Sequence, residues 1–173
     1  MGTAIDLLSA QTIAMTPSTE FADLYQRHYA AVFRTALRVT GNPADAEDVL
    51  QTVFLRVLIQ GGHLESTHAP EAYFRRAATN AALDLLRKKV SHGEIRLDEA
   101  SSLASEEDVT LLKMRLRRAI AALDSSDALM FMLRYVEGMS NGELAEMFGQ
   151  EKNNVAVRLH RIRQNLQIEI ERS

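Results

Sequence analysis

Apolar residues recur at intervals of three and four along nearly all of this 173-residue chain, which is the spacing of amphipathic α-helices. Glycines at Gly41, Gly61, Gly138 and Gly149 mark where several of the apolar runs stop. The pattern predicts an all-α fold, with helices over about 19–40, 43–60, 70–89, 109–123, 125–137, 141–148 and from about 152 onward.

The helix expected from residue 43 has a clear start and a sharply divided surface. Asn42 can cap it, and Pro43 occupies the first turn, where a helix tolerates a residue without an N–H. Three carboxylates follow where the helix dipole favours negative charge: Asp45, Glu47 and Asp48. Away from the apolar face, the surface is polar with one leucine: Asp48, Gln51, Thr52 and Leu55. Such a surface suits a protein partner, although an ordinary solvent-facing helix has the same pattern.

The helix expected from Pro70 combines aromatic and basic residues. Two rings, Tyr73 and Phe74, are followed by polar and basic side chains: Arg75, Arg76, Asn80, Arg87 and Lys88. Aromatic rings stack on unpaired bases while guanidinium groups hold phosphates, so the pattern suits a single nucleic-acid strand. Equally, both rings can belong to the core and the basic residues can be solvated. The preceding loop, 61–69, holds two histidines, but no carboxylate or cysteine geometry supports them as metal ligands, so no metal or cofactor is expected.

The net charge of −3 is unevenly distributed. Residues 93–109 hold six acids and one base, whereas 19–92 and 110–173 are each slightly basic. We therefore expect a loose N-terminal extension over 1–18, a helical domain over 19–92, a flexible acidic linker over 93–108 and a second helical domain over 109–173. Units with so little charge would bind DNA weakly by themselves and would need a larger partner.

The second domain contains the spacing of a helix-turn-helix. Ser140 and Glu143 have the spacing of a capping box. Ala145, Gly149 and Val155 then supply a small residue where two helices approach, a turn residue and an apolar residue that packs the second helix back. The region from residue 152 is the candidate recognition helix.

Several classes of protein fit the sequence poorly. The chain has no cysteine and no apolar run long enough for a membrane span, and residues 1–19 carry no basic residue for a secretory signal. No nucleophile and base occur in a catalytic pattern, and the histidines are scattered. We expect a cytoplasmic protein that is not an enzyme and has no segment inserted in a membrane.

Two groups of motifs resemble a known family. The segments 45–54 and 73–88 resemble the helices with which bacterial sigma factors of the extracytoplasmic-function (ECF) group bind core RNA polymerase and read the minus-ten promoter element. Segment 133–161 resembles the sigma domain that reads the minus-thirty-five element. The resemblance implies three partners: core RNA polymerase, promoter DNA and an anti-sigma protein.

The resemblance also assigns roles to residues of this chain. Polymerase binding falls to Asp45, Asp48, Gln51, Thr52 and Leu55. Minus-ten binding falls to His63, Leu64, Tyr73, Phe74, Arg75, Arg76, Asn80, Arg87 and Lys88. Minus-thirty-five binding falls to Lys152, Asn153, Asn154, Ala156, Val157, Arg158, His160 and Arg161.

The sequence departs from the family pattern at the entry to the recognition helix. Ala156 and Val157 stand where the family usually has a basic residue and a serine, and neither offers a hydrogen bond to a base or phosphate. We therefore expect weaker or altered minus-thirty-five reading. Thr52 stands where a carboxylate is common, and Tyr73 or Phe74 where tryptophan is common. Two other functions stay open: a freestanding helix-turn-helix regulator, and a sigma-derived protein that titrates a partner.

Overall fold

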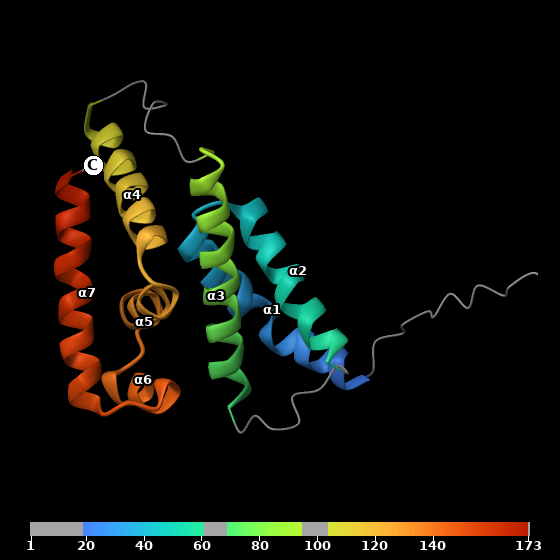
Figure 1. Ribbon diagram of the computed structural model, residues 1–173. Coiled ribbons are helices and arrows are strands. Elements are labelled where there is room, and N and C mark those ends of the chain that lie inside the picture. The colour runs from blue at the N-terminus through green and yellow to red at the C-terminus, as the bar shows by residue number, and fades with distance from the viewer. Residues whose placement is uncertain (1–18, 61–68, 95–103, 173) are drawn as a thin grey trace, which may run out of the picture.

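The computed structural model describes residues 19–60, 69–94 and 104–172, and every element within them is a helix. The helices are α1 (Thr19–Thr40), α2 (Pro43–Ile59), α3 (Pro70–Ser91), α4 (Ala104–Ala122), α5 (Ser125–Tyr135), α6 (Asn141–Phe148) and α7 (Lys152–Arg172) (Figure 1). The predicted all-α fold is confirmed. The one clear difference in bounds is α4, which begins inside the segment expected to be linker.

Local chemistry explains where α2 and α6 begin. The Asn42 side chain accepts hydrogen bonds from the backbone N–H groups of Ala44 and Asp45, at 2.8 and 3.3 Å, so it caps α2 as predicted. Ser140 and Glu143 form the predicted capping box at the start of α6. Both helices therefore start where a polar side chain replaces the missing intrahelical acceptors.

The chain forms two helical units. In the first, α1 packs against both α2 and α3. Its fully or almost fully buried side chains include Val32, Ala36, Val49, Val53, Phe54, Phe74, Ala78 and Ala82. In the second, α7 packs against α4, α5 and α6 around buried Leu129, Met130, Leu133, Leu144, Val155, Leu159 and Ile162. Each unit buries the apolar stripes that the sequence pattern marks.

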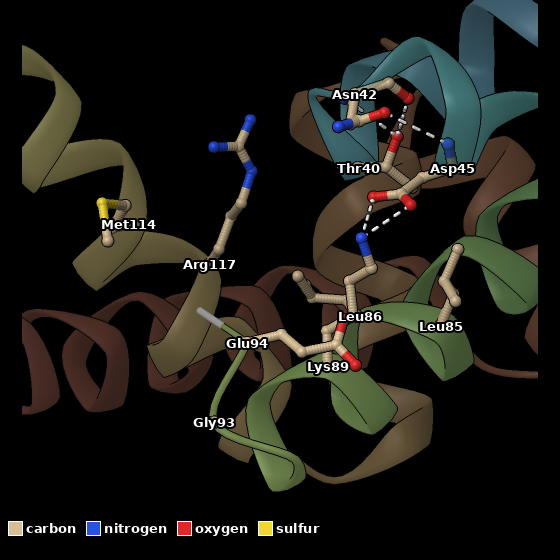
Figure 2. Close-up of a pocket in the computed structure, with 10 residues that line it drawn as sticks. All are labelled: Thr40, Asn42, Asp45, Leu85, Leu86, Lys89, Gly93, Glu94, Met114 and Arg117. Atoms are coloured by element: carbon tan, nitrogen blue, oxygen red, sulfur yellow. Dashed lines mark hydrogen bonds and ion pairs between the residues drawn. The ribbon is translucent and has the colours of Figure 1, made fainter. Parts of the chain in front are cut away.

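The two units also pack against each other, which the sequence pattern did not predict. Helix α3 lies between α1 and α2 on one side and the second unit on the other (Figure 1), and it contacts both α4 and α5. The buried side chains of both units form one continuous cluster. Beside this contact lies a pocket of about 610 Å³, lined by residues from both units, among them Asn42, Lys89 and Arg117 (Figure 2).

Candidate functional site

The outer face of α2 carries most of the predicted polymerase-binding residues. Asp48, Gln51 and Leu55 are exposed, Leu55 to 55%. Thr52 is half-buried, and its hydroxyl donates to the Asp48 carbonyl at 2.8 Å. One exposed apolar residue on this face was not among those predicted: Ile59, one helical turn beyond Leu55, is 80% exposed. Spacing by four from Leu55 is the signal that could have found it.

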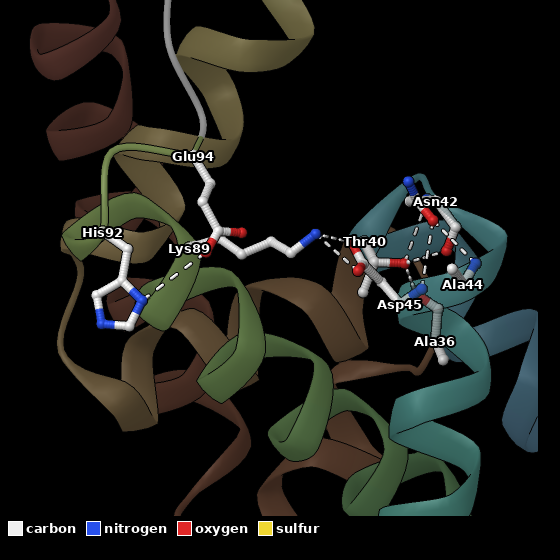
Figure 3. Close-up of polar contacts among 8 residues, drawn as sticks. All are labelled: Ala36, Thr40, Asn42, Ala44, Asp45, Lys89, His92 and Glu94. Carbon is white, nitrogen blue, oxygen red and sulfur yellow. Dashed lines mark hydrogen bonds and ion pairs between the residues drawn. The ribbon is translucent and has the colours of Figure 1, made fainter.

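Asp45 is placed differently from the other predicted polymerase contacts. Its carboxylate accepts from the Lys89 ammonium at 2.7 and 2.8 Å, and the Asp45 side chain is only 13% exposed (Figure 3). The pair joins the start of α2 to the end of α3. Asp45 is therefore less accessible than Asp48 and its charge is paired within the first unit; its predicted polymerase contact stays a prediction.

The two aromatic rings at the start of α3 have different environments. Phe74 is 1% exposed and its ring centroid lies 5.3 Å from that of Phe54 and 4.5 Å from the His28 ring. Burial, and then the nearby Arg27 charge, lower the pKa of His28, which favours the neutral form of the imidazole stacked on Phe74. Tyr73 is half-buried. The Phe74 ring lies in the core, which is the alternative that the sequence left open, and its DNA contact stays a prediction.

The basic residues of α3 are partly occupied by contacts within the chain. Arg75 pairs with Glu71, and Arg87 pairs with Asp84 at 3.5 Å. Arg76 is exposed, but its Nη1 lies 3.5 Å from the Met147 carbonyl oxygen of the second unit. The remaining predicted minus-ten residues are half-buried Asn80, exposed Lys88, and His63 and Leu64, which lie outside the described residues.

The start of α7 presents a mixed polar and apolar surface. Exposed on it are the predicted residues Lys152, Asn153, Asn154, Ala156, Val157, His160 and Arg161. The inner side of the same turns holds Val155 and Leu159, both buried. The helix therefore divides as the sequence pattern predicted, with Lys152 and Arg161 as the basic groups of the outer side.

Arg158 is an exception within the predicted DNA-binding set. Its Nε donates to the Asp127 carboxylate at 2.6 Å and its Nη2 donates to the Ser126 hydroxyl at 2.8 Å. Both acceptors lie in the first turn of α5. The side chain is only 26% exposed, so Arg158 fastens α7 to α5 instead of facing outward. Its predicted role as a direct DNA contact stays a prediction, and would require these contacts with α5 to break.

The turn before α7 has the geometry that the sequence spacing predicted. Gly149 adopts φ 62°, in the left-handed region, at the end of α6. Leu144 on α6 and Val155 on α7 are fully buried on the two sides of this turn. The Ser140 backbone N–H donates to the Glu143 carboxylate at 2.8 Å and, with the Ser140 side chain, lowers the pKa of Glu143; the Ser140 hydroxyl accepts from the Glu143 N–H at 3.2 Å.

A capped short helix, a left-handed glycine turn and a longer helix with an outward polar side form a helix-turn-helix, the motif of a large class of DNA-binding proteins. Two family models match the chain: Sigma-70 region 2 over residues 24–91, and Sigma-70, region 4 over residues 113–166. The chain belongs to the sigma-70 family of transcription initiation factors, in its ECF group.

Curated relatives agree with the two family matches. The chain is 30% identical to the ECF RNA polymerase sigma factor SigE of Mycolicibacterium smegmatis, over 95% of this chain and 66% of that protein. It is 29% identical to SigL of Mycobacterium tuberculosis, over 79% of this chain and 81% of the relative. It is 24% identical to SigW of Bacillus subtilis, over 84% and 86% of the two chains.

No helix in the described ranges is both long enough and apolar enough to cross a bilayer. Within those ranges, no three histidine, aspartate or glutamate side chains come together as a metal-binding group.

Proposed function

We propose that this chain is a sigma factor that binds core RNA polymerase and directs promoter-specific initiation of transcription. The observation that carries the proposal is the presence of both sigma-70 regions, in order, on one chain. The first unit would bind polymerase and the minus-ten element, and the second would bind the minus-thirty-five element. The chain would work in the cytoplasm without catalysing a reaction, because the polymerase supplies the chemistry. An anti-sigma protein is a further proposed partner.

The outer face of α2 is the proposed docking surface for polymerase. It offers a carboxylate, an amide and two exposed apolar side chains on successive turns: Asp48, Gln51, Leu55 and Ile59. Exposed apolar residues beside polar groups are typical of a surface that another protein covers. Asp45 would contribute indirectly, since its pair with Lys89 holds the start of α2 against α3.

Minus-ten reading is assigned to the accessible side chains of α3. Tyr73 offers a ring for stacking, and Arg76 and Lys88 offer charge for phosphates. The family likeness adds His63 and Leu64 from the preceding loop.

Minus-thirty-five reading is assigned to the outer side of α7. Lys152, Asn153, Asn154 and Arg161 supply the hydrogen-bond donors. Ala156 and Val157 are exposed and can touch only apolar groups such as a thymine methyl. We expect that few base contacts determine the minus-thirty-five preference, and that DNA shape and phosphate contacts contribute more to it.

The test is run-off transcription with core polymerase on a library of randomised promoters. The proposal predicts transcripts of defined start site that require both the chain and the polymerase. The double variant Asp48→Ala/Gln51→Ala should abolish them. Asp23→Ala/Gln26→Ala is the matched control, since it makes the same changes at the same spacing on exposed positions of α1 and should leave transcription intact.

The same assay separates the two rival functions. A freestanding regulator would bind specific duplex DNA without polymerase. A titrating protein would bind its partner and yield no transcript. Equal transcription from the Asp48→Ala/Gln51→Ala variant and the wild type would reject α2 as the docking surface.

A further inference from the structure

A pocket at the turn between α1 and α2 combines charged and apolar side chains. Its volume is about 610 Å³, and it lies between that turn, the end of α3 and α4 (Figure 2). Small-molecule sites in proteins usually have volumes of about 300–1,000 Å³. Of the residues that line the pocket, only Asp45 belongs to the predicted polymerase-binding or DNA-binding sets. The pocket is therefore large enough for a small molecule, and the proposed function does not account for it.

Arg117 of α4 brings an unpartnered positive charge to this pocket. Gly41 adopts φ 70°, and a Cβ placed on it would overlap the Arg117 guanidinium. The guanidinium can therefore approach the turn only because residue 41 has no side chain. Within the described ranges, no hydrogen bond or ion pair engages the Arg117 side chain, which is half-buried. A guanidinium in this position can donate two parallel hydrogen bonds to a carboxylate or phosphate group.

The other charged side chains of the pocket leave the Arg117 charge available. Lys89 and Asp45 form an ion pair at 2.7 Å, so each neutralises the other. The Glu94 side chain is 54% exposed, and its carboxylate lies 3.8 Å from His92 Nδ1. Water and salt screen a charge that is so exposed. The half-buried Arg117 is therefore the group best placed to attract a ligand, and the ligand that it attracts is an anion.

A second donor and an apolar wall complete the pocket. The Asn42 side-chain oxygen is occupied, because it accepts from two backbone N–H groups in the first turn of α2. The Asn42 amide nitrogen remains a donor, and Figure 2 shows the Asn42 side chain and the Arg117 guanidinium on opposite sides of the pocket. The apolar lining consists of Leu85, Leu86 and Met114. A ligand with an acid group and an apolar body matches both parts of this lining.

We propose that this pocket binds a small organic anion. Its carboxylate or phosphate group accepts hydrogen bonds from the Arg117 guanidinium and the Asn42 amide, and its apolar body lies on Leu85, Leu86 and Met114. The site takes residues from both helical units, so it exists only in the folded chain as a whole. The inference goes beyond the proposed function and does not depend on it.

The test is a titration of the full chain, followed through its backbone amide signals in NMR spectra. The probes are phenylacetate and phenyl phosphate, and phenylacetamide is the matched uncharged control. Both anions should bind with dissociation constants of about 1 mM, an ordinary affinity for about ten non-hydrogen atoms. They should shift the amide signals of Gly41, Gly93 and Arg117, which surround the pocket. Phenylacetamide should bind about tenfold more weakly, because it has no charge to pair with Arg117.

The decisive variant is Arg117→Gln, which removes the charge and keeps a polar side chain of similar reach. It should weaken binding of both anions about tenfold and leave the affinity for phenylacetamide unchanged. The matched control is Lys113→Gln, which removes the same charge from an exposed position one turn earlier on α4 and should leave all affinities unchanged. Both variants should keep the helix content of the wild type in circular dichroism, since Arg117 has no partner to lose within the described ranges.

Three results would overturn the proposal. The first is the absence of shifts at the pocket amides with both anions, and the second is equal affinity for phenylacetate and phenylacetamide. The third is equal anion affinity of Arg117→Gln and Lys113→Gln. Binding of only one of the two anions would support the proposal and identify the acid group that the pocket takes.

Run-off transcription separates this inference from the proposed function. A chain that binds the anions through Arg117 but yields no transcripts with core polymerase would reject the proposed function and leave the anion site intact. A chain that directs transcription but binds neither anion would overturn only the anion site.

Discussion

Neighbouring rings on α3 allow a direct test of which side chains form the core and which read DNA. Phe74 is 1% exposed and packs on Phe54, whereas Tyr73 is half-buried. The matched variants are Phe74→Leu and Tyr73→Leu, which both remove an aromatic ring and keep an apolar side chain. If the assignment is right, the first changes stability and the second changes binding of a single strand.

The magnitudes follow from burial. Truncating a core phenylalanine to alanine costs about 3–5 kcal/mol, a large fraction of the roughly 5–15 kcal/mol that stabilises a domain. Phe74→Leu retains most of the volume and should lower the free energy of unfolding by about 1 kcal/mol, and Phe74→Ala by the full amount. Tyr73→Leu should stay within about 0.5 kcal/mol of the wild type, since Tyr73 is only partly buried and leucine keeps an apolar side chain there.

DNA binding should show the opposite order. Stacking of a base on an aromatic ring contributes about 1–3 kcal/mol, so Tyr73→Leu should weaken binding of the minus-ten strand by roughly five- to 150-fold. Phe74→Leu should leave it unchanged. Urea unfolding followed by circular dichroism gives stability, and fluorescence anisotropy of the strand bound to the polymerase complex gives affinity. Weakened strand binding by Phe74→Leu at an unchanged unfolding midpoint would show that the Phe74 ring leaves the core to stack on DNA.

Two further predictions concern the second unit. Arg158→Gln breaks the contact with Asp127 and should lower the free energy of unfolding by about 1–3 kcal/mol. Arg161 is exposed, so Arg161→Gln should leave thermal stability intact and lower the salt dependence of DNA binding by about one unit. If Arg158→Gln is as stable as the wild type but binds DNA less well, Arg158 is a direct DNA contact. The second prediction concerns pH. The hydrogen bonds with Ser140 lower the pKa of Glu143 from its ordinary 4.5. The ionised Glu143 therefore stabilises the fold above pH 4.5, and this stabilisation is lost as the pH falls through the lowered pKa. Melting temperatures should therefore be lower for Glu143→Gln than for the wild type at pH 7 and should converge in acid, while a constant difference across pH would contradict the linkage.

Most of the secondary structure could be predicted from the sequence because it depends on neighbours in the chain. The Asn42 cap, the Ser140 capping box and the Gly149 turn each involve residues within a few positions of one another, and all three form as expected. The apolar faces of the helices could also be predicted, because a helix returns to the same face every three to four residues. The family likeness added the order of the two units.

Tertiary structure alone decided which side chains remain available. Phe74 and Tyr73 are adjacent and chemically alike, yet a rotation of about 100° along the helix places one in the core and leaves the other accessible. Arg158 was indistinguishable in sequence from an outward arginine until α5 brought Asp127 to it.

The packing of the two units against each other could not be predicted from the sequence pattern. Glu137 meets Thr35 and Arg38 across about a hundred residues, and no local pattern relates positions so far apart. The sequence by itself determined the helices, their caps and their buried faces, since these depend on short-range spacing. Which helix meets which, and hence which charges are covered, depends on the three-dimensional packing of surfaces that only the folded chain brings together.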